Sequence, residues 1–139
     1  MGTAPSGTWA SPGDGHLIFE IDQDYDGANY GNINGAANVM DGTWHHIAFV
    51  RQGTAMSIYL DGNLDGSGFS AGVTNLMENY NARIGQISCA GGQNFGGLID
   101  DVTMWTGHAL TESEIRLIVC VAGHPKELAL RKCGERCTN

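Results

Sequence analysis

The sequence predicts an all-β fold, a jelly-roll β-sandwich of two antiparallel sheets with a short helical segment near the C-terminus. Glycine accounts for 21 of the 139 residues, about twice its usual share of roughly 7%, without the three-residue period of collagen, so many turns are expected. Apolar and polar residues alternate in short runs that turn pairs such as Asp-Gly separate. A helix-start pattern occurs only after residue 110. Short strands followed by helix are typical of one sandwich domain.

The clearest strand patterns lie in the first half of the chain. Residues His16–Asp22 alternate between apolar and polar side chains, which predicts a strand with one face in the core. The next strands are expected over 29–34, 44–51 and Ala55–Leu60. The strand over 44–51 places Trp44 in the core, and Asp61-Gly62 ends the following strand as a hairpin turn.

Weaker strand patterns follow in the second half. Strands are expected near 68–73 and 82–87, and a clear strand over 98–105 places Trp105 in the core. The sequence therefore predicts mainly strands up to residue 105.

Helix signals appear at the end of the chain. Thr111 and Glu114 have the spacing of a capping box, which predicts a helix over 112–119. Pro125 suits the first turn of a second helix over 126–133.

Domain organisation follows from these patterns and from charge. We expect a sandwich over 1–119, with 1–15 as an arm or edge strand, and a basic, cysteine-rich tail over 120–139 packed on it. Residues 1–115 carry 13 acidic and two basic side chains, whereas residues 116–139 carry two acidic and five basic ones. The net charge of −8 disfavours a sequence-independent grip on nucleic acid.

Targeting signals are missing from the sequence. No apolar run approaches the roughly 20 residues of a membrane span. The N-terminus lacks the basic and apolar regions of a signal peptide, so we interpret Met1-Gly2 as a start added to a mature or excised segment.

The four cysteines suggest a secreted, extracellular protein. An even number in a small β domain favours disulfides in an oxidising compartment, and the three possible pairings stay open. The candidates are Cys89, Cys120, Cys133 and Cys137. The alternative is a zinc site that adds His124 to the last three cysteines. Zinc modules usually have tighter cysteine pairs, so disulfides are favoured.

Two long motifs resemble a known family. The runs WHHIA (44–48) and IYLDG (58–62) resemble the paired central strands of laminin-G-like and pentraxin-like domains, members of the concanavalin A-like lectin/glucanase superfamily. The runs FGGLIDDVTMW (95–105) and ALTESEI (109–115) are similar to the terminal strand and short helix of that family. The resemblance covers roughly residues 16–119 and implies a jelly-roll sandwich.

The resemblance implies calcium at some positions and not at others. Pentraxins have carboxylates where this chain has Ile87-Ser88-Cys89, so that calcium loop is lost here. In the superfamily an aspartate at the position of Asp100 often helps to hold a structural calcium. A second candidate is the run of Asp22, Asp24 and Asp26, which opens like an EF-hand loop.

That aspartate run has two interpretations. Ile33 occupies the place of the bidentate glutamate, so it is not an EF-hand, and a plain hairpin turn competes with a different calcium site. Calcium is therefore an expectation for Asp22, Asp24, Asp26 and Asp100, and no other cofactor is expected.

A catalytic alternative involves Glu20 and Asp22. The run Glu20-Ile21-Asp22-Gln23-Asp24 resembles the signature of laminarinase-type glycoside hydrolases, whose carboxylates act as nucleophile and acid. The last position is aspartate, and those enzymes need a longer chain, so we expect no enzyme.

The candidate ligand-binding residues are aromatic and amide side chains in Asn- and Gly-rich loops, which suit stacking on sugar rings and bonding to their hydroxyls. They are Tyr25, Asn29, Tyr30, Tyr80 and Asn94. The expected function is non-catalytic, extracellular recognition of a glycan or of an extracellular protein ligand, with calcium as a candidate cofactor. The alternative is a structural, adhesion or assembly module, whose open sheet edge would permit a homodimer.

Overall fold

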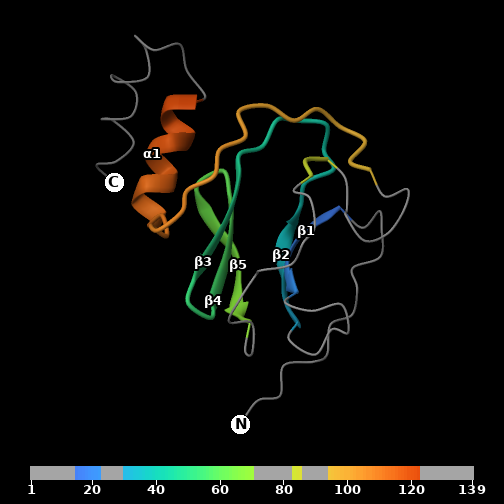
Figure 1. The fold of residues 1–139 in the computed structure, drawn as a ribbon. Helices are drawn as coiled ribbons and strands as arrows, with labels where there is room; N and C mark the ends of the chain where they lie inside the picture. The colour runs from blue at the N-terminus through green and yellow to red at the C-terminus, as the bar shows by residue number, and fades with distance from the viewer. Residues whose placement is uncertain (1–14, 23–29, 71–82, 86–93, 123–139) are drawn as a thin grey trace.

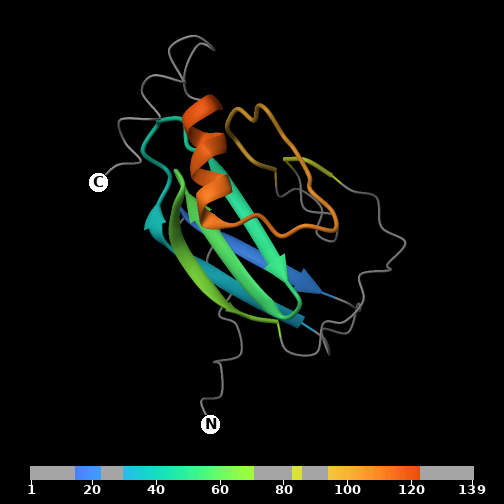
Figure 2. The same ribbon diagram turned by 90° about the vertical axis from the view of Figure 1, so that its left-hand side faces the viewer.

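Two antiparallel sheets form the centre of the molecule. The computed structural model describes residues 15–22, 30–70, 83–85 and 94–122. Its elements are β1 (His16–Asp22), β2 (Tyr30–Asn38), β3 (Ile47–Gln52), β4 (Ala55–Leu60), β5 (Asn63–Phe69) and α1 (Glu112–Ala122). Within the described part, β1 pairs with β2, and β3, β4 and β5 form a three-stranded meander. Figures 1 and 2 show the two sheets as stacked layers. The predicted mainly-β sandwich with a short helix is confirmed.

The hydrophobic core lies between the two sheets. Ile21 and Ile33 from one sheet are buried with Met56 and Ile58 from the other, and Leu17 and Phe19 pack against them in part. The Phe19 ring also contacts the Phe49 ring, with 5.2 Å between centroids. The alternation predicted for β1 therefore places its apolar side chains as expected.

The three-stranded sheet has two different faces. Met56 and Ile58 project from β4 into the core, on what we call the inner face. Ser57 and Tyr59 alternate with them and project to the opposite side, the outer face. The register pairs Val50 with Ser57, so Val50 also lies on the outer face.

Glycine lets β2 and β5 approach closely. A Cβ atom at Gly66 would lie 2.4 Å from the Asn34 carbonyl oxygen, and one at Gly68 would lie 2.6 Å from Cγ2 of Ile33. The carboxylate of Asp65 accepts a hydrogen bond from the Ala37 amide at 3.0 Å across the same contact. Part of the glycine excess thus sits in strands, where close packing requires it, and not in turns as the composition suggests.

Turn geometry corrects one predicted strand. Asp61 and Gly62 both have positive φ, 50° and 82°, as type I′ hairpin turns require. The next strand follows such a two-residue turn directly, so β5 (Asn63–Phe69) begins five residues before the predicted start at 68. Residues 71–73 of that prediction lie outside the described residues.

Other strand boundaries also differ. The strand after the first turn is longer than the predicted 29–34 and continues to Asn38. The strand predicted over 44–51 begins only at Ile47. Trp44 precedes it and is 66% exposed, so the prediction of a core position was wrong.

An irregular arch replaces the strand predicted over 98–105. Residues 94–111, which we call the arch, run from the side of β1 and β2 over the ends of the strands to α1 (Figure 1). Asn94 forms an isolated bridge, but no ladder follows it, and the positive φ of 49° at Asp101 interrupts an extended chain. Trp105 is 48% exposed and not in the core. The described residues 83–85 also form no strand, and the rest of the segment predicted over 82–87 lies outside the described residues.

The predicted helix is confirmed and extends three residues further. The Thr111 amide donates to the Glu114 carboxylate at 2.7 Å, and the Glu114 amide donates to the Thr111 hydroxyl at 3.3 Å, which completes the capping box. Ile115 is fully buried, and Arg116 donates to the Gly62 carbonyl at 3.2 Å. These contacts fix α1 to the β4–β5 turn.

The remaining fold predictions concern residues outside the described part. These are the arm over 1–15, of which only residue 15 is described, and the second helix over 126–133. The division into a sandwich over 1–119 and a tail over 120–139 stays a prediction. In the described part of the chain, no helix has the length and apolarity needed to cross a bilayer.

Candidate functional site

The loop residues proposed as ligand contacts fall mostly outside the described residues. This applies to Tyr25, Asn29 and Tyr80. Tyr30 is the first residue of β2, and Asn94 is exposed at the start of the arch. These five positions therefore stay a prediction.

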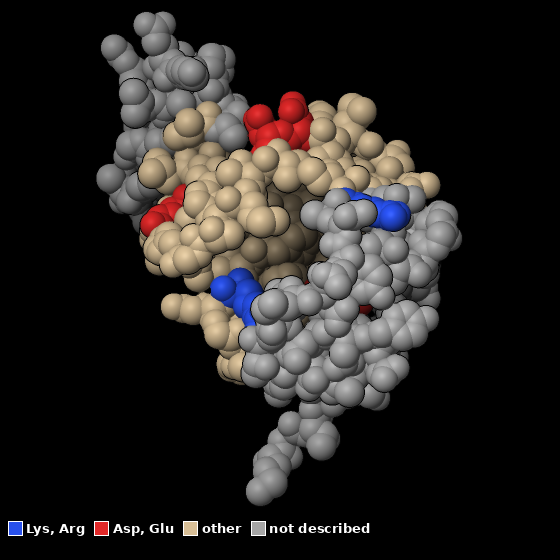
Figure 3. Space-filling model, viewed as in Figure 1, with Lys and Arg blue, Asp and Glu red and all other residues tan. Residues whose placement is uncertain are grey.

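The described residues alone do not supply a calcium site. Asp24 and Asp26 lie outside them, and Asp22 ends β1. Asp100 is exposed on the arch, and its carboxylate accepts a hydrogen bond from the Asp101 amide at 2.9 Å. No three His, Cys, Asp or Glu side chains in the described part are grouped to hold a metal ion. On the face of the molecule shown in Figure 3, the acidic side chains lie at separate places, and the surface is hollowed near the centre.

The predicted catalytic pair and the cysteines are described only in part. Glu20 is exposed on β1, and Asp22 follows two residues later. Cys120 lies near the C-terminal end of α1 and is disulfide-bonded, whereas Cys89, Cys133 and Cys137 lie outside the described residues. The pairing of the cysteines stays a prediction.

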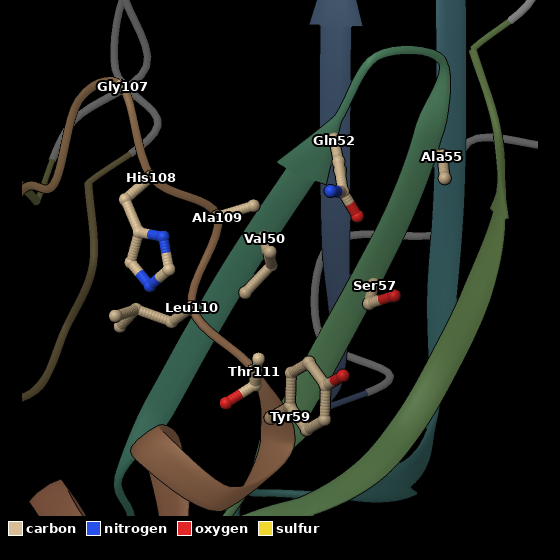
Figure 4. Close-up of a pocket in the computed structure, with 10 residues that line it drawn as sticks. All are labelled: Val50, Gln52, Ala55, Ser57, Tyr59, Gly107, His108, Ala109, Leu110 and Thr111. Atoms are coloured by element: carbon tan, nitrogen blue, oxygen red, sulfur yellow. The ribbon is translucent and has the colours of Figure 1, made fainter.

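A groove that the sequence did not suggest lies on the outer face of the three-stranded sheet. Strands β3 and β4 form its floor, and the end of the arch forms its wall (Figure 4). The hollow has a volume of about 440 Å³. It is lined by Val50, Gln52, Ala55, Ser57, Tyr59, Gly107, His108, Ala109, Leu110 and Thr111.

A second hollow of about 320 Å³ continues the first. It is lined by Arg51, Gln52, Gly53, Trp105, Gly107, His108 and Ala109, four of which also line the first hollow. The two hollows therefore lie next to each other, and we call them together the groove, with Tyr59 lining one part and Trp105 the other.

Hydrogen bonds hold the wall of the groove in place. Nε2 of His108 lies 3.0 and 3.1 Å from the two carboxylate oxygens of Glu114. The same carboxylate accepts hydrogen bonds from the Thr111 amide and hydroxyl. The bond from the Thr111 amide, then that from its hydroxyl, then that with His108 lower the pKa of Glu114 to about 2. A charged Glu114 thus joins the groove wall to the start of α1.

The groove combines aromatic, polar and apolar groups. Tyr59 and Trp105 supply aromatic rings, and Gln52, Ser57 and His108 supply hydrogen-bonding groups. No Asp or Glu is among the described residues that line it. Arg51 is the one permanent charge among these described residues, and its Nε donates to the Gly53 carbonyl at 2.9 Å. Such a surface suits an uncharged ligand with one apolar face and several hydroxyl groups.

A second polar cluster fixes the turn at the end of β4. The Asp61 carboxylate lies 2.8 Å from Nδ1 of His45 and also accepts from the His46 amide at 2.8 Å. Asp41 lies 3.1 Å from Nε2 of His45 and accepts from the Thr43 amide. The bond to Asp61, then that to Asp41, raise the pKa of His45 above 6.5. The bonds from Thr43, then that from His45, lower the pKa of Asp41 to about 2. We interpret this cluster as structural.

The fold defines the class of the protein as an antiparallel β-sandwich with a groove on one sheet. Residues 6–116 match the laminin G-type family described as the concanavalin A-like lectin/glucanases superfamily. The chain belongs to this superfamily, which confirms the resemblance predicted from the sequence.

One solved structure gives a further comparison. The 2.1 Å crystal structure of an S-layer domain-containing protein from Clostridium thermocellum, residues 221–444, is similar with a TM-score of 0.51 and 25% sequence identity. The match covers 76% of this chain and 52% of that chain, so this chain spans about half the length of the solved structure. No curated protein matches the sequence.

Proposed function

We propose that this domain is an extracellular, non-catalytic recognition module that binds carbohydrate in the groove. The observation that carries the proposal is the groove itself, where Tyr59 and Trp105 accompany the polar groups of Gln52, Ser57 and His108. Aromatic faces pack on the apolar faces of sugar rings, and neighbouring polar groups bond the hydroxyls. Membership of a superfamily that includes lectins supports this reading, and the similar S-layer domain-containing protein supports an extracellular location.

The lining of the groove supports binding without hydrolysis. Glycoside hydrolysis ordinarily requires two carboxyl groups on opposite sides of the scissile bond. The part of the groove lining that the structure describes contains none, and Glu20 lies on β1 in the other sheet. We therefore expect that Glu20→Gln leaves carbohydrate binding unchanged and that the domain releases no reducing ends from β-glucans.

A glycan array tests the proposal. The domain is applied to neutral and acidic glycans, once with calcium and once with EDTA. The expected result is binding that Tyr59→Ala weakens and Trp44→Ala does not, because Trp44 is exposed outside the groove. An absence of binding in both buffers would contradict the proposal. Loss of binding in EDTA would instead favour the calcium ligands predicted at Asp22, Asp24, Asp26 and Asp100.

The exposed apolar surface favours a second candidate function, a module for surface assembly. Leu98, Val102 and Met104 on the arch are all more than half exposed. Strand β3 lies at an edge of its sheet in the described part, and open edges invite pairing with another chain. Sedimentation velocity over a dilution series tests this candidate. Concentration-dependent dimers are expected if it holds, and a strict monomer at the highest concentration would exclude a homodimer.

A further inference from the structure

We infer that the groove binds at least two consecutive uncharged sugar units, one in contact with Tyr59 and the next in contact with Trp105, without a bound metal ion. This inference rests on the proposed carbohydrate-binding function and specifies the class of ligand.

The size of the groove supports a ligand longer than one sugar ring. Its two parts measure about 440 and 320 Å³, and each lies within the range of about 300–1,000 Å³ typical of small-molecule sites. Tyr59 lies four positions along β4 from Ala55, which pairs with Gln52. At about 3.3 Å per residue this is roughly 13 Å of strand, which exceeds the length of a single six-membered ring.

The two parts of the groove have one chemical feature in common. Each has one aromatic side chain, Tyr59 in the first and Trp105 in the second. Gln52 and His108 line both parts. A pair of stacking surfaces joined by shared polar groups fits two consecutive rings better than one.

The charges of the groove favour an uncharged ligand. The His108 ring contacts the Glu114 carboxylate, and Nε of Arg51 donates to the Gly53 carbonyl although the guanidinium keeps its positive charge. The whole chain has a formal net charge of −8, which repels anions at long range. We therefore expect neutral sugars to bind more tightly than acidic sugars.

The lining also argues against a metal-bridged sugar. Calcium requires several oxygen ligands, most often carboxylates, and none of the groove residues within the described ranges is Asp or Glu. The hydrogen-bonding groups of the groove are amide, hydroxyl and imidazole groups, which contact sugar hydroxyls directly.

Isothermal titration calorimetry in EDTA tests the inference. The probes are glucose, galactose, mannose and N-acetylglucosamine, each with its β-linked di- and trisaccharides, and one uronic acid-containing disaccharide. For the best-bound series we expect the disaccharide to bind at least about tenfold more tightly than its monosaccharide. We expect Trp105→Ala to remove this gain and to weaken monosaccharide binding less than disaccharide binding.

Controls separate this inference from the proposed function. Trp44→Ala removes an exposed aromatic outside the groove and should change neither affinity. Four results would overturn the inference and leave carbohydrate recognition standing. Two concern the ligand: equal affinity for mono- and disaccharide, or tightest binding of the acidic disaccharide. The other two are loss in EDTA of binding seen with calcium, and a Trp105→Ala variant that behaves like Trp44→Ala. If no glycan binds in either buffer, the proposed function fails and the inference falls with it. Matching far-ultraviolet circular dichroism of each variant excludes misfolding as the cause.

Discussion

The two faces of strand β4 serve different purposes although their residues alternate along six positions of one chain. Met56 and Ile58 are almost fully buried on the inner face, against β1 and β2. Ser57 and Tyr59 are only partly buried on the outer face, where they line the groove. The difference shows that one strand can hold the fold with one set of side chains and present a binding surface with the other.

The largest effect is expected from a cavity on the inner face. Ile58→Ala removes buried methyl groups from the centre of the core and should lower the free energy of unfolding by about 2–5 kcal/mol. Ser57→Ala, the neighbour on the outer face, should change it by less than about 0.5 kcal/mol. Urea unfolding of both variants measures the difference. Equal losses would show that the two faces do not differ in this way.

The next largest loss of stability is expected at the close backbone contact between β5 and β2. Gly66→Ala places a methyl group on the Asn34 carbonyl, and the two sheets must separate, which should cost about 1–3 kcal/mol. Gly96 has open space around its Cβ position and no positive φ, so Gly96→Ala is the matched control and should be nearly neutral. Thermal unfolding of the two variants compares them, and an unchanged melting temperature for Gly66→Ala would contradict the close packing.

The wall of the outer face depends on the helix cap. Thr111→Ala removes the hydroxyl that caps α1 and bonds Glu114, and should cost about 1 kcal/mol of stability. Because Thr111 also lines the groove, carbohydrate affinity should fall as well. Thr111→Ser keeps the hydroxyl and should restore both properties. A Thr111→Ser variant as impaired as Thr111→Ala would contradict this role of the cap.

The smallest effect concerns pH and the turn at the end of β4. The pKa of His45 is raised above 6.5 by Asp61 and Asp41, so its contribution to stability is complete below pH 6.5 and is lost as pH rises through the folded-state pKa. Asp41 and Glu114 have pKa values of about 2, and their contributions disappear only in acid, as pH falls from the ordinary values of 3.8 and 4.5 toward 2.

A variant isolates the contribution of His45. In the unsubstituted protein, the urea concentration at the unfolding midpoint should decline between neutral and alkaline pH. In His45→Asn this decline should be smaller. A decline of the same size in both proteins would assign it to another group.

Local sequence patterns were sufficient to predict the elements whose signals lie within a few neighbouring residues. Alternation was sufficient for β1 and β4, and the capping box for the start of α1, because these signals lie within a few residues. The arch was mispredicted because its sequence alternates like a strand, although Asp101 adopts positive φ and the described structure pairs no strand with it. Trp44 and Trp105 were assigned to the core for the same reason.

The groove could not be predicted from local patterns. It forms where β3 and β4 meet the end of the arch, about fifty residues later in the chain, and only the tertiary fold brings Tyr59 and His108 to one surface. The available signal in the sequence was the alternation along β4, which predicts that Ser57 and Tyr59 project away from the side of Met56 and Ile58. That signal identifies a non-core face but not what covers it.

The most direct test of the division between the two faces is Tyr59→Ala, measured for both binding and stability. Calorimetry with the best-bound disaccharide and urea unfolding are carried out on the same preparation. We predict that affinity falls at least about tenfold, while the free energy of unfolding changes much less than in Ile58→Ala. Unchanged affinity, or a stability loss as large as that of Ile58→Ala, would contradict the account.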